Sequence, residues 1–386
     1  MNICVSGTAV ICSIGNNIES TWNNLIKGHS GIEKITQKFP NNIKDFHAYT
    51  IKDDSAFRVK SRNFGSATGL FYNTVAQALE DAELKINNKS RIGISVGTTM
   101  GEIERLEKSL NNKNLFTSIG MNGPNVIADE IYDLLNLNGP NWTLTNACAA
   151  GNLAISRAMM DIKFGRADVM IVGGVDILSW VALVGFNSLR ALSPNACKPF
   201  NKSRQGVALG EGAGVLILES KEHLENRLKK PKAVLSGFGL SCDAYHITQP
   251  NPKAIGAMQS MNNSLKMANL AANEIDYISA HGTGTIANDL MENVAIETLF
   301  KESKPPVSSI KGNIGHTLGA ASAIEAVVSI KMLEMDTVPE NKYLDVIDPA
   351  IKINVLRASE SKRVEKVISN SFAFGGINTS LVIERW

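Results

Sequence analysis

The sequence predicts an α/β fold, because short runs of β-branched residues alternate with segments of helical periodicity. Three buried strands are predicted, at residues 91–96, 168–174 and 214–219. Three helices are predicted between and beyond them, at residues 66–84, 151–164 and 320–335. The strands are continuously apolar, which is typical of sheets that helices cover on both faces.

Two segments far apart in the chain have similar sequences, which indicates an internal duplication. Gly210–Glu219 and Gly375–Glu384 each place a glycine-containing turn before an apolar strand. The charged stretch Lys221–Lys232, a predicted surface helix and linker, lies between them. We therefore predict two similar halves, residues 1–235 and 236–386. Two unrelated strands after glycine turns are the alternative.

Composition excludes several classes of partner. The chain has 386 residues, 44% of them hydrophobic, which is enough for a large core. Its 39 lysines and arginines nearly balance 37 aspartates and glutamates, so the net charge of +2 predicts neither nucleic-acid nor membrane binding. The first residues have no basic segment followed by a long apolar run, and we expect a cytoplasmic protein.

The spacing of cysteines and histidines argues against a metal site or a disulfide framework. The five cysteines are widely separated and form no C-x-x-C pair, and no two of the six histidines have metal-ligand spacing. If a cysteine and a histidine cooperate, the fold must bring them together.

Cys148 is the candidate nucleophile, because it lies where the predicted strand at 141–145 turns into a helix. Unpaired N–H groups and the positive end of a helix dipole lower the pKa of a thiol from its free value of about 8.5. The alternative is a small buried cysteine, which we expect for Cys4 and Cys12 on the first strand and its turn. Cys197 and Cys242 lie in predicted loops and are also expected to be unreactive.

Two histidines, His281 and His316, share an unusual setting. They occur in Ala280-His-Gly-Thr-Gly-Thr285 and Lys311-Gly-Asn-Ile-Gly-His-Thr-Leu-Gly-Ala320, each after a predicted strand. Glycine-rich loops let the backbone approach a ligand closely, whereas a core histidine more often has bulky neighbours. Either one alone could be a structural histidine, but their combination with Cys148 indicates a catalytic group.

These residues resemble the motifs of the β-ketoacyl-acyl carrier protein synthases, specifically the elongating type with a Cys-His-His site. The resemblance runs along nearly the whole chain. The resemblance rests on four motifs: Asn146-Ala-Cys-Ala-Ala-Gly, His281-Gly-Thr-Gly-Thr, Lys311-Gly-Asn-Ile-Gly-His-Thr-Leu-Gly-Ala-Ala and Asn370-Ser-Phe-Ala-Phe-Gly-Gly-Ile-Asn. It implies the thiolase fold, a duplicated αβαβα layered architecture.

The resemblance also implies a role for individual residues. Cys148 looks like the acylated nucleophile, with the backbone N–H groups of Cys148 and Phe372 as its oxyanion hole. His281 and His316 would face the second substrate. The remaining residues resemble supporting groups: Lys311 and Glu325 fixing the last histidine, Thr283 and Thr285 holding the phosphopantetheine arm, Phe372 as a gate, Asp243 and His246 on a second mobile loop, and Met100 lining the distal acyl pocket.

The implied reaction is a decarboxylative condensation of an acyl chain on Cys148 with malonyl-acyl carrier protein, without a metal or organic cofactor. A thiolase would need a second cysteine near the C-terminus, and none follows Cys242. An initiating synthase would have asparagine at His316. A non-catalytic chain-length-factor-like subunit, which lacks the nucleophile, stays as the alternative function.

The implied partners are an acidic acyl carrier protein and a second ketosynthase-like subunit, which is either a second copy of this chain or a different chain. Because the whole chain is nearly neutral, carrier binding needs a local basic patch, for which the candidates are Lys60, Arg62, Lys198, Lys202 and Arg204. Ala373 and Ile377 depart from the family's glycine and threonine, which predicts a stiffer gate. Ser322 and Lys198-Pro-Phe-Asn201 depart from the family pattern as well. These departures leave the identity of the acyl substrate undecided between fatty-acid biosynthesis and specialised polyketide or polyene biosynthesis.

Overall fold

The computed structural model describes residues 2–39, 42–60, 62, 64–87, 89–111 and 123–386. Its strands are β1 (Ile3–Cys12), β2 (Ile32–Phe39), β3 (Asn42–Tyr49), β4 (Ile92–Gly97), β5 (Asn141–Leu144), β6 (Val169–Asp176), β7 (Gly212–Glu219), β8 (Ala233–Cys242), β9 (Tyr277–Ser279), β10 (Val307–Ser308), β11 (Thr337–Val338), β12 (Glu360–Ser361), β13 (Lys366–Phe372) and β14 (Ile377–Arg385). Its α-helices are α1 (Ile18–Ile26), α2 (Ser66–Asp81), α3 (Ile103–Asn111), α4 (Val126–Leu134), α5 (Ala150–Lys163), α6 (Trp180–Ser188), α7 (Lys221–Asn226), α8 (Ile255–Ala268), α9 (Ile286–Leu299), α10 (Lys311–Ile314) and α11 (Ala321–Met335). Short 3₁₀ turns include η3 (Ala147–Ala149) and η5 (Leu318–Ala320).

The main sheet consists of two halves with the same topology. Within the described ranges it has ten strands, in the order β10-β9-β13-β14-β8-β1-β7-β6-β4-β5. Counted within each half, the strand order is third, second, fourth, fifth, first, and parallel and antiparallel pairs fall at equivalent places. The two first strands join the halves, because β1 pairs antiparallel with β8. The predicted duplication is thus visible in the topology.

The sequence similarity noted above falls on equivalent strands. The segments 210–219 and 375–384 cover β7 and all but the last residue of β14, which are the fifth strands of the two halves. The connection between halves is the segment 220–232 with α7, so the boundary predicted after residue 235 lies inside β8.

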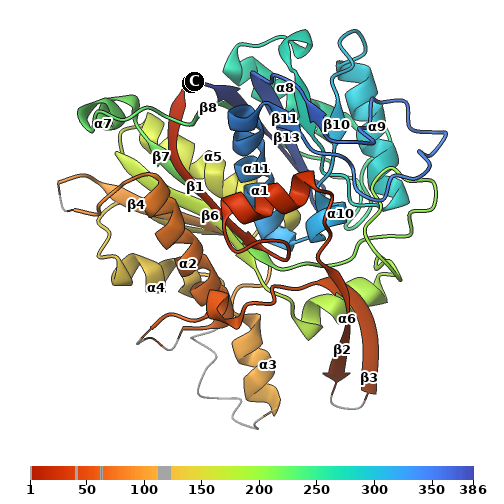
Figure 1. Ribbon diagram of the computed structural model, residues 1–386, viewed down its shortest axis with the longest axis horizontal. Coiled ribbons are helices and arrows are strands. Elements are labelled where there is room, and N and C mark those ends of the chain that lie inside the picture. Colours follow the sequence, from red (N-terminus) through yellow and green to blue (C-terminus); the bar gives the residue numbers. More distant parts are fainter. Residues whose placement is uncertain (1, 40–41, 61, 63, 88, 112–122) are drawn as a thin grey trace.

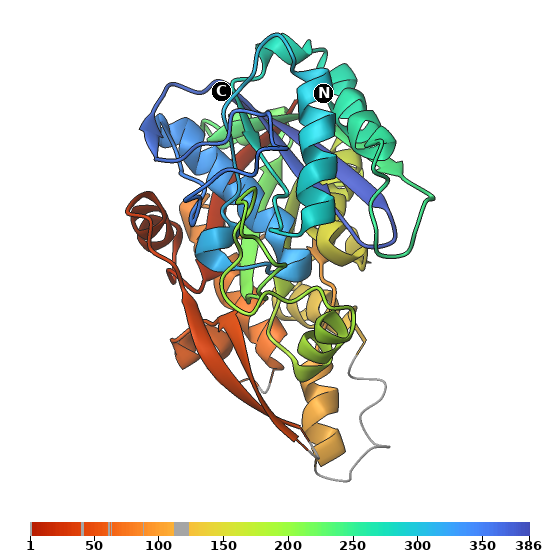
Figure 2. The ribbon, with the colours of Figure 1, turned by 90° about the vertical axis from the view of Figure 1, so that its right-hand side faces the viewer.

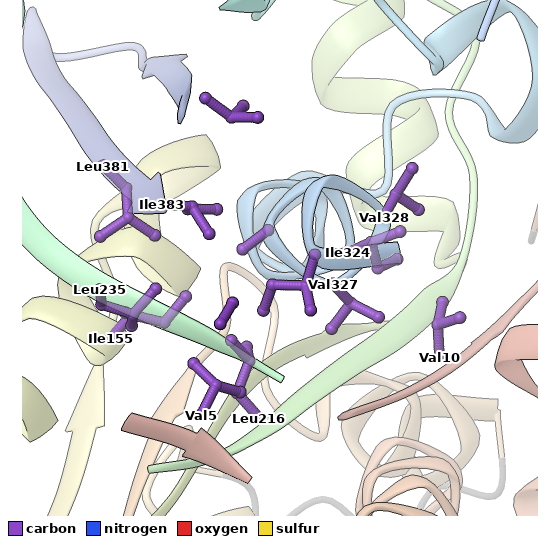
Figure 3. Packing of buried hydrophobic residues seen from close by; sticks show 14 of the residues in the cluster. Val5, Val10, Ile155, Leu216, Leu235, Ile324, Val327, Val328, Leu381 and Ile383 are labelled. Atoms are coloured by element: carbon purple, nitrogen blue, oxygen red, sulfur yellow. The ribbon is translucent and has the colours of Figure 1, made fainter. Parts of the chain in front are cut away.

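Two helices form the centre of the molecule. The apolar faces of α5 and α11 pack against each other and against inward residues of β1, β6, β7, β8, β13 and β14. Figure 3 shows α11 nearly end-on, with Val327 on the side that faces Val5 and Leu216 and Ile324 on the side that faces Val10. α11 is buried on almost all sides, which explains its continuous apolar sequence.

The outer faces of the sheet are covered by two further helical layers. α2 and α4 cover the N-terminal half, and α8 and α9 cover the C-terminal half (Figure 1). The layers therefore alternate as αβαβα, as the sequence resemblance implied. The β2–β3 ribbon and α3 extend from one end of this body (Figure 2). None of the helices in the described ranges is both long and apolar enough to cross a membrane.

Candidate active site

Two of the candidate catalytic residues follow the ends of strands that occupy equivalent places in the two halves. Cys148 lies in η3 after β5, and His316 lies between α10 and η5 after β10. β5 and β10 are the two outermost strands of the sheet. Packing of α5 on α11 brings η3 and η5 into contact, so the sheet's opposite ends contribute to one site.

A single pocket contains the predicted trio. It has a volume of about 350 Å³, and Cys148, His281 and His316 line it together with Phe372. His281 follows β9, and Phe372 is the last residue of β13. The rings of His281 and His316 have centroids 5.5 Å apart and are nearly perpendicular.

The environment of Cys148 differs from the sequence expectation. The thiol is buried, and its burial raises its pKa to about 12. The positive charge of Lys311 opposes this increase in the pKa, whereas the carboxylate of Asp176 adds to it. The predicted lowering of the thiol pKa is therefore wrong, because desolvation outweighs the groups that lower it, Lys311 first among them. Cys148 is a neutral thiol at rest.

Hydrogen bonds define the tautomers of both histidines. Nδ1 of His316 accepts the N–H of Leu318 at 3.1 Å, and Nδ1 of His281 lies 3.4 Å from the Lys311 ammonium. An imidazole nitrogen that accepts a hydrogen bond carries no proton, so the proton lies on Nε2. Burial, and then the charge of Lys311, holds the pKa of each histidine well below its ordinary value. Both rings are thus neutral and have Nε2–H as their donor.

Lys311 is an anchor for this arrangement. Its Nζ donates to the carbonyl oxygen of His281 at 2.6 Å and lies 2.5 Å from Glu325 Oε1 on α11. Burial raises the pKa of Glu325 to about 7, and Lys311 opposes that shift. The predicted Lys311–Glu325 pair is therefore in direct contact. Hydrogen bonds of the Lys311 side chain tie the loop of His281 to the central helix, whereas the resemblance assigned the pair to His316.

Two acidic residues on α9, Asp289 and Glu292, support the His281 loop and were missed in the sequence. Glu292 accepts the N–H groups of His281 and Gly282, each at 2.8 Å. Asp289 accepts the N–H groups of Gly284 at 3.2 Å and of Phe200 at 2.8 Å. The sequence pattern that could have identified them is their spacing of three residues, which places both on one face of a helix that begins directly after the Gly-Thr-Gly-Thr loop.

The predicted pantetheine ligands, Thr283 and Thr285, line the same pocket. Their hydroxyl oxygens are 3.0 Å apart. Thr285 also caps α9, where its side chain accepts the N–H of Asn288 at 3.3 Å. The cap holds this hydroxyl beside the pocket.

Phe372 and Phe374 have different surroundings, which changes the candidate for the gate. Phe372 is buried at the end of β13, in register with Asn378 of β14, and its ring centroid lies 6.0 Å from that of His281 with the two planes at 69°. Phe374 is half-buried in the following turn, lines the pocket and stacks on Phe186 of α6. A ring held in a strand and core cannot swing without disrupting both, which argues against Phe372 as the gate and makes Phe374 the candidate.

The second predicted loop contacts this turn, but only one of its two predicted residues reaches the pocket. Asp243 lines the pocket and accepts from Asn378 Nδ2 at 2.9 Å. The backbone N–H of Asp243 donates to Gly376. His246 is exposed outside the pocket, where its Nδ1 accepts two backbone N–H groups of its own loop.

Met100 does not line this pocket. It packs against the same hydrophobic cluster as Phe186, whose ring lines the pocket wall. Its predicted effect on chain length stays a prediction.

The predicted basic patch is only partly exposed. Lys60, Arg62 and Lys202 are exposed and Lys198 is half-buried, whereas the Arg204 side chain is 1% exposed. Arg204 pairs with Asp348 at 2.6 Å and with Asp289 at 3.4 Å. Arg204 is therefore an internal ion-pair residue, and its assignment to a carrier-binding surface is wrong.

Arg190 was not among the candidates. Within the described part of the chain, it is the one lysine or arginine that lines the pocket, and its side chain is exposed. Across the same part of the chain, no group of three or more His, Cys, Asp or Glu side chains could hold a metal ion.

The duplicated layers, together with a buried thiol and two neutral histidines that line one pocket, define a condensing enzyme of the thiolase fold. Residues 1–223 match the family described as beta-ketoacyl synthase, N-terminal domain, and residues 232–345 match its C-terminal domain. The chain belongs to the beta-ketoacyl synthase family.

Its relatives and structural neighbours extend over the full chain. The 3-oxoacyl-[acyl-carrier-protein] synthase 2 of Coxiella burnetii is 35% identical, and the match covers 99% of this chain and 98% of that protein. The ishigamide ketosynthase/chain length factor superimposes with a TM-score of 0.91 at 32% identity, covering 100% and 99% of the two chains. A ketosynthase in complex with its chain length factor from Xenorhabdus doucetiae has a TM-score of 0.90 at 29% identity, covering 100% and 98%.

Proposed function

We propose that this enzyme transfers an acyl group to Cys148 and condenses it with malonyl-acyl carrier protein, giving β-ketoacyl-acyl carrier protein. The observation that carries this proposal is the convergence of one thiol and two neutral imidazoles in one pocket, with Nε2–H as the donor of both rings. A complete set of reacting groups favours this function over a non-catalytic chain-length-factor-like subunit.

In the first step the Cys148 sulfur attacks the thioester carbon of the acyl-carrier substrate. A new C–S bond forms, the old one breaks, and the thiol proton leaves on the pantetheine sulfur, so no external base is consumed. The carbonyl oxygen is held by the N–H of Cys148 and by an N–H from the end of β13. Phe372 is a candidate there, because its strand neighbour Ala373 donates to Ile377 on β14 and consecutive N–H groups point to opposite sides.

In the second step malonyl-acyl carrier protein loses carbon dioxide, and negative charge develops on its thioester oxygen. The Nε2–H donors of His281 and His316 stabilise this enolate, and their low pKa keeps them as neutral donors. The enolate carbon then attacks acyl-Cys148. A C–C bond forms, the C–S bond breaks, and the sulfur of Cys148 takes up a proton.

Binding of the carrier involves groups at the pocket and around it. Thr283 and Thr285 are positioned to hydrogen-bond the pantetheine arm. Basic residues then meet the acidic carrier protein: Arg190, Lys60, Arg62, Lys198 and Lys202. We propose a cytoplasmic enzyme that uses no metal or organic cofactor of its own and pairs with itself or with a ketosynthase-like partner. The pathway is fatty-acid or polyketide biosynthesis.

Variants that separate the two steps test this function. Cys148→Ala should abolish covalent acylation and condensation but retain malonyl decarboxylation, since both Nε2–H donors remain. His316→Ala should spare most acylation and reduce decarboxylation roughly 10²-fold to 10³-fold, as is typical for loss of such a donor. Acyl-enzyme is measured by intact-protein mass spectrometry, and carbon dioxide release is measured from malonyl-acyl carrier protein.

Matched controls are available elsewhere in the chain. Cys4→Ala removes a buried thiol from β1, and His29→Ala removes an exposed imidazole. Both should leave the two half-reactions unchanged. Normal decarboxylation by His316→Ala with failed acylation would reverse the proposed roles.

A further inference from the structure

Asp176 is a buried carboxylate that the proposed reaction does not use. It is the last residue of β6 and has no exposed surface. Its two oxygens accept only N–H and O–H donors, from Thr98 Oγ1 at 2.9 Å, Thr99 N at 2.9 Å, Met100 N at 2.8 Å and Gly319 N at 2.6 Å. Burial raises the pKa of Asp176 to about 6, and the hydrogen bonds from these donors oppose that shift, so that at neutral pH the carboxylate is an ionised acceptor.

These donors come from both halves of the molecule. Thr98, Thr99 and Met100 form the turn after β4 in the N-terminal half, whereas Gly319 belongs to η5 in the C-terminal half. The contact is too close for a larger residue, because a Cβ on Gly319 would lie 2.8 Å from Asp176 Oδ2 and 2.8 Å from Thr99 N. Asp176 therefore fixes η5 against the N-terminal half.

η5 controls the ring of His316. The backbone of His316 is held separately, since its N–H donates to Ala208 and its carbonyl accepts from Gly210. Among the described residues, the side chain has one hydrogen-bond partner, the N–H of Leu318, which precedes Gly319. The Leu318 N–H and the Gly319 N–H belong to consecutive peptide units that meet at the Leu318 Cα. Holding the Gly319 N–H therefore restricts the backbone torsions of Leu318, and these torsions set the direction of the Leu318 N–H toward Nδ1.

We propose that Asp176 is a positioning residue for His316: by holding the Gly319 N–H, it directs the Leu318 N–H onto Nδ1 and so keeps the proton of His316 on Nε2, facing the enolate. Asp176 does not touch the substrate. This inference rests on the proposed role of His316 as an enolate donor.

The test is Asp176→Asn, which keeps the side-chain shape but replaces one accepting oxygen with an NH₂ donor. We expect malonyl decarboxylation to fall about tenfold to hundredfold, which is less than the roughly 10²-fold to 10³-fold loss on removing an oxyanion donor outright, while acyl-enzyme formation changes less than about threefold. In ¹⁵N NMR of histidine-labelled protein, His316 should change from a pure Nε2–H tautomer to a mixture.

Asp276→Asn is the matched control. Asp276 accepts the N–H groups of Glu365 and Lys366 at 2.9 and 3.0 Å, just before β9 and away from the pocket. It should leave the ratio of the half-reactions and the His316 tautomer unchanged. If Asp176→Asn does not fold, Gly319→Ala decides, because its Cβ displaces the same contact while the carboxylate remains.

Each result has a defined meaning. Equal losses in both half-reactions, or no loss, with an unchanged His316 signal in the folded variant would overturn the inference. Normal decarboxylation by His316→Ala would instead overturn the proposed function, whatever Asp176→Asn does to the tautomer. A selective loss of decarboxylation with a changed tautomer supports Asp176 as the positioning residue.

Discussion

At the scale of single residues, the protonation state of Cys148 decides how acylation starts. Burial keeps the thiol neutral, and each neighbouring histidine has Nδ1 occupied as an acceptor and its proton on Nε2. Neither ring is arranged to take the thiol proton. Acylation therefore depends on direct exchange between two sulfur atoms inside a desolvated pocket.

The pH dependence of alkylation tests this state of Cys148. Its raised pKa of about 12 means that the thiolate fraction grows throughout the accessible pH range. The rate of Cys148 modification by iodoacetamide should rise about tenfold per pH unit from pH 7 to 10, without a plateau. The Cys242→Ser variant removes the exposed cysteine, and peptide mass spectrometry reads the Cys148 site. A plateau below pH 9 would mean that the helix N-terminus dominates after all.

Arg204 and Lys202 are two residues apart but should behave differently. Arg204→Met leaves Asp289 buried without its counter-charge, and removal of one partner of a buried ion pair costs about 3–5 kcal/mol of unfolding free energy. Lys202→Glu changes an exposed residue and should alter that free energy by less than about 0.5 kcal/mol.

Enzyme kinetics should also distinguish Lys202 from Arg204. Lys202→Glu should raise KM for the carrier-bound substrate, and more strongly at low salt, because long-range charge attraction is screened by salt. Urea denaturation and steady-state kinetics at two ionic strengths provide both measurements. An unstable Lys202→Glu, or an Arg204→Met with full stability, would contradict these assignments.

At the scale of elements, the β13–β14 turn and the loop that follows β8 are hydrogen-bonded to each other. Gly375 N donates to Ile247, and Asp243 N donates to Gly376. The two residues that depart from the family pattern, Ala373 and Ile377, close the turn through one hydrogen bond. Opening of the turn therefore requires movement of both segments.

Phenylalanine truncations distinguish the gate from the core. Phe374→Ala should cost little stability and should change the rate and chain-length profile of acylation, because it removes a half-buried ring from the pocket wall. Phe372→Ala should cost about 3–5 kcal/mol, as for other buried aromatic residues. Thermal unfolding and acyl-enzyme mass spectrometry over a panel of chain lengths test both. The reverse pattern would restore Phe372 as the gate.

At the scale of the whole molecule, the two outer edges of the sheet differ. The β10 edge is covered, since Val307 exchanges hydrogen bonds with Asn354 and Leu356. No described segment covers the outer edge of β5, where Trp142 is 38% exposed. An uncovered edge strand beside an exposed aromatic residue is a pairing surface, and we expect the subunit contact there.

Thr143→Pro tests this contact. The carbonyl oxygens of Pro140 and Leu144 accept from β4, so the alternate residue Thr143 directs its N–H outward. Proline removes that N–H at an edge position, where the strand itself tolerates it. Native mass spectrometry should show loss of the dimer for Thr143→Pro and its retention for Thr143→Val. A dimer that survives the proline would place the interface elsewhere.

Much of this architecture was predictable because its signals are local. The apolar strands and helices follow from residues that are close in sequence, and the similarity between 210–219 and 375–384 marked equivalent strands. The glycine-rich loops around His281 and His316 and the turn at Cys148 also carry their own sequence patterns. These patterns were sufficient to predict the α/β class, the duplication and the three residues that line one pocket.

Other properties depend on contacts between distant segments, and only the tertiary structure decided them. Burial reversed the expected shift in the Cys148 pKa, and two aspartates from other elements turned Arg204 into an internal residue. Asp176 accepts a hydrogen bond from Gly319, beside the His316 loop, although the two residues are 143 positions apart in the sequence. Desolvation and ion pairing between distant residues depend on which segments the fold packs together. A local stretch of sequence does not contain that information.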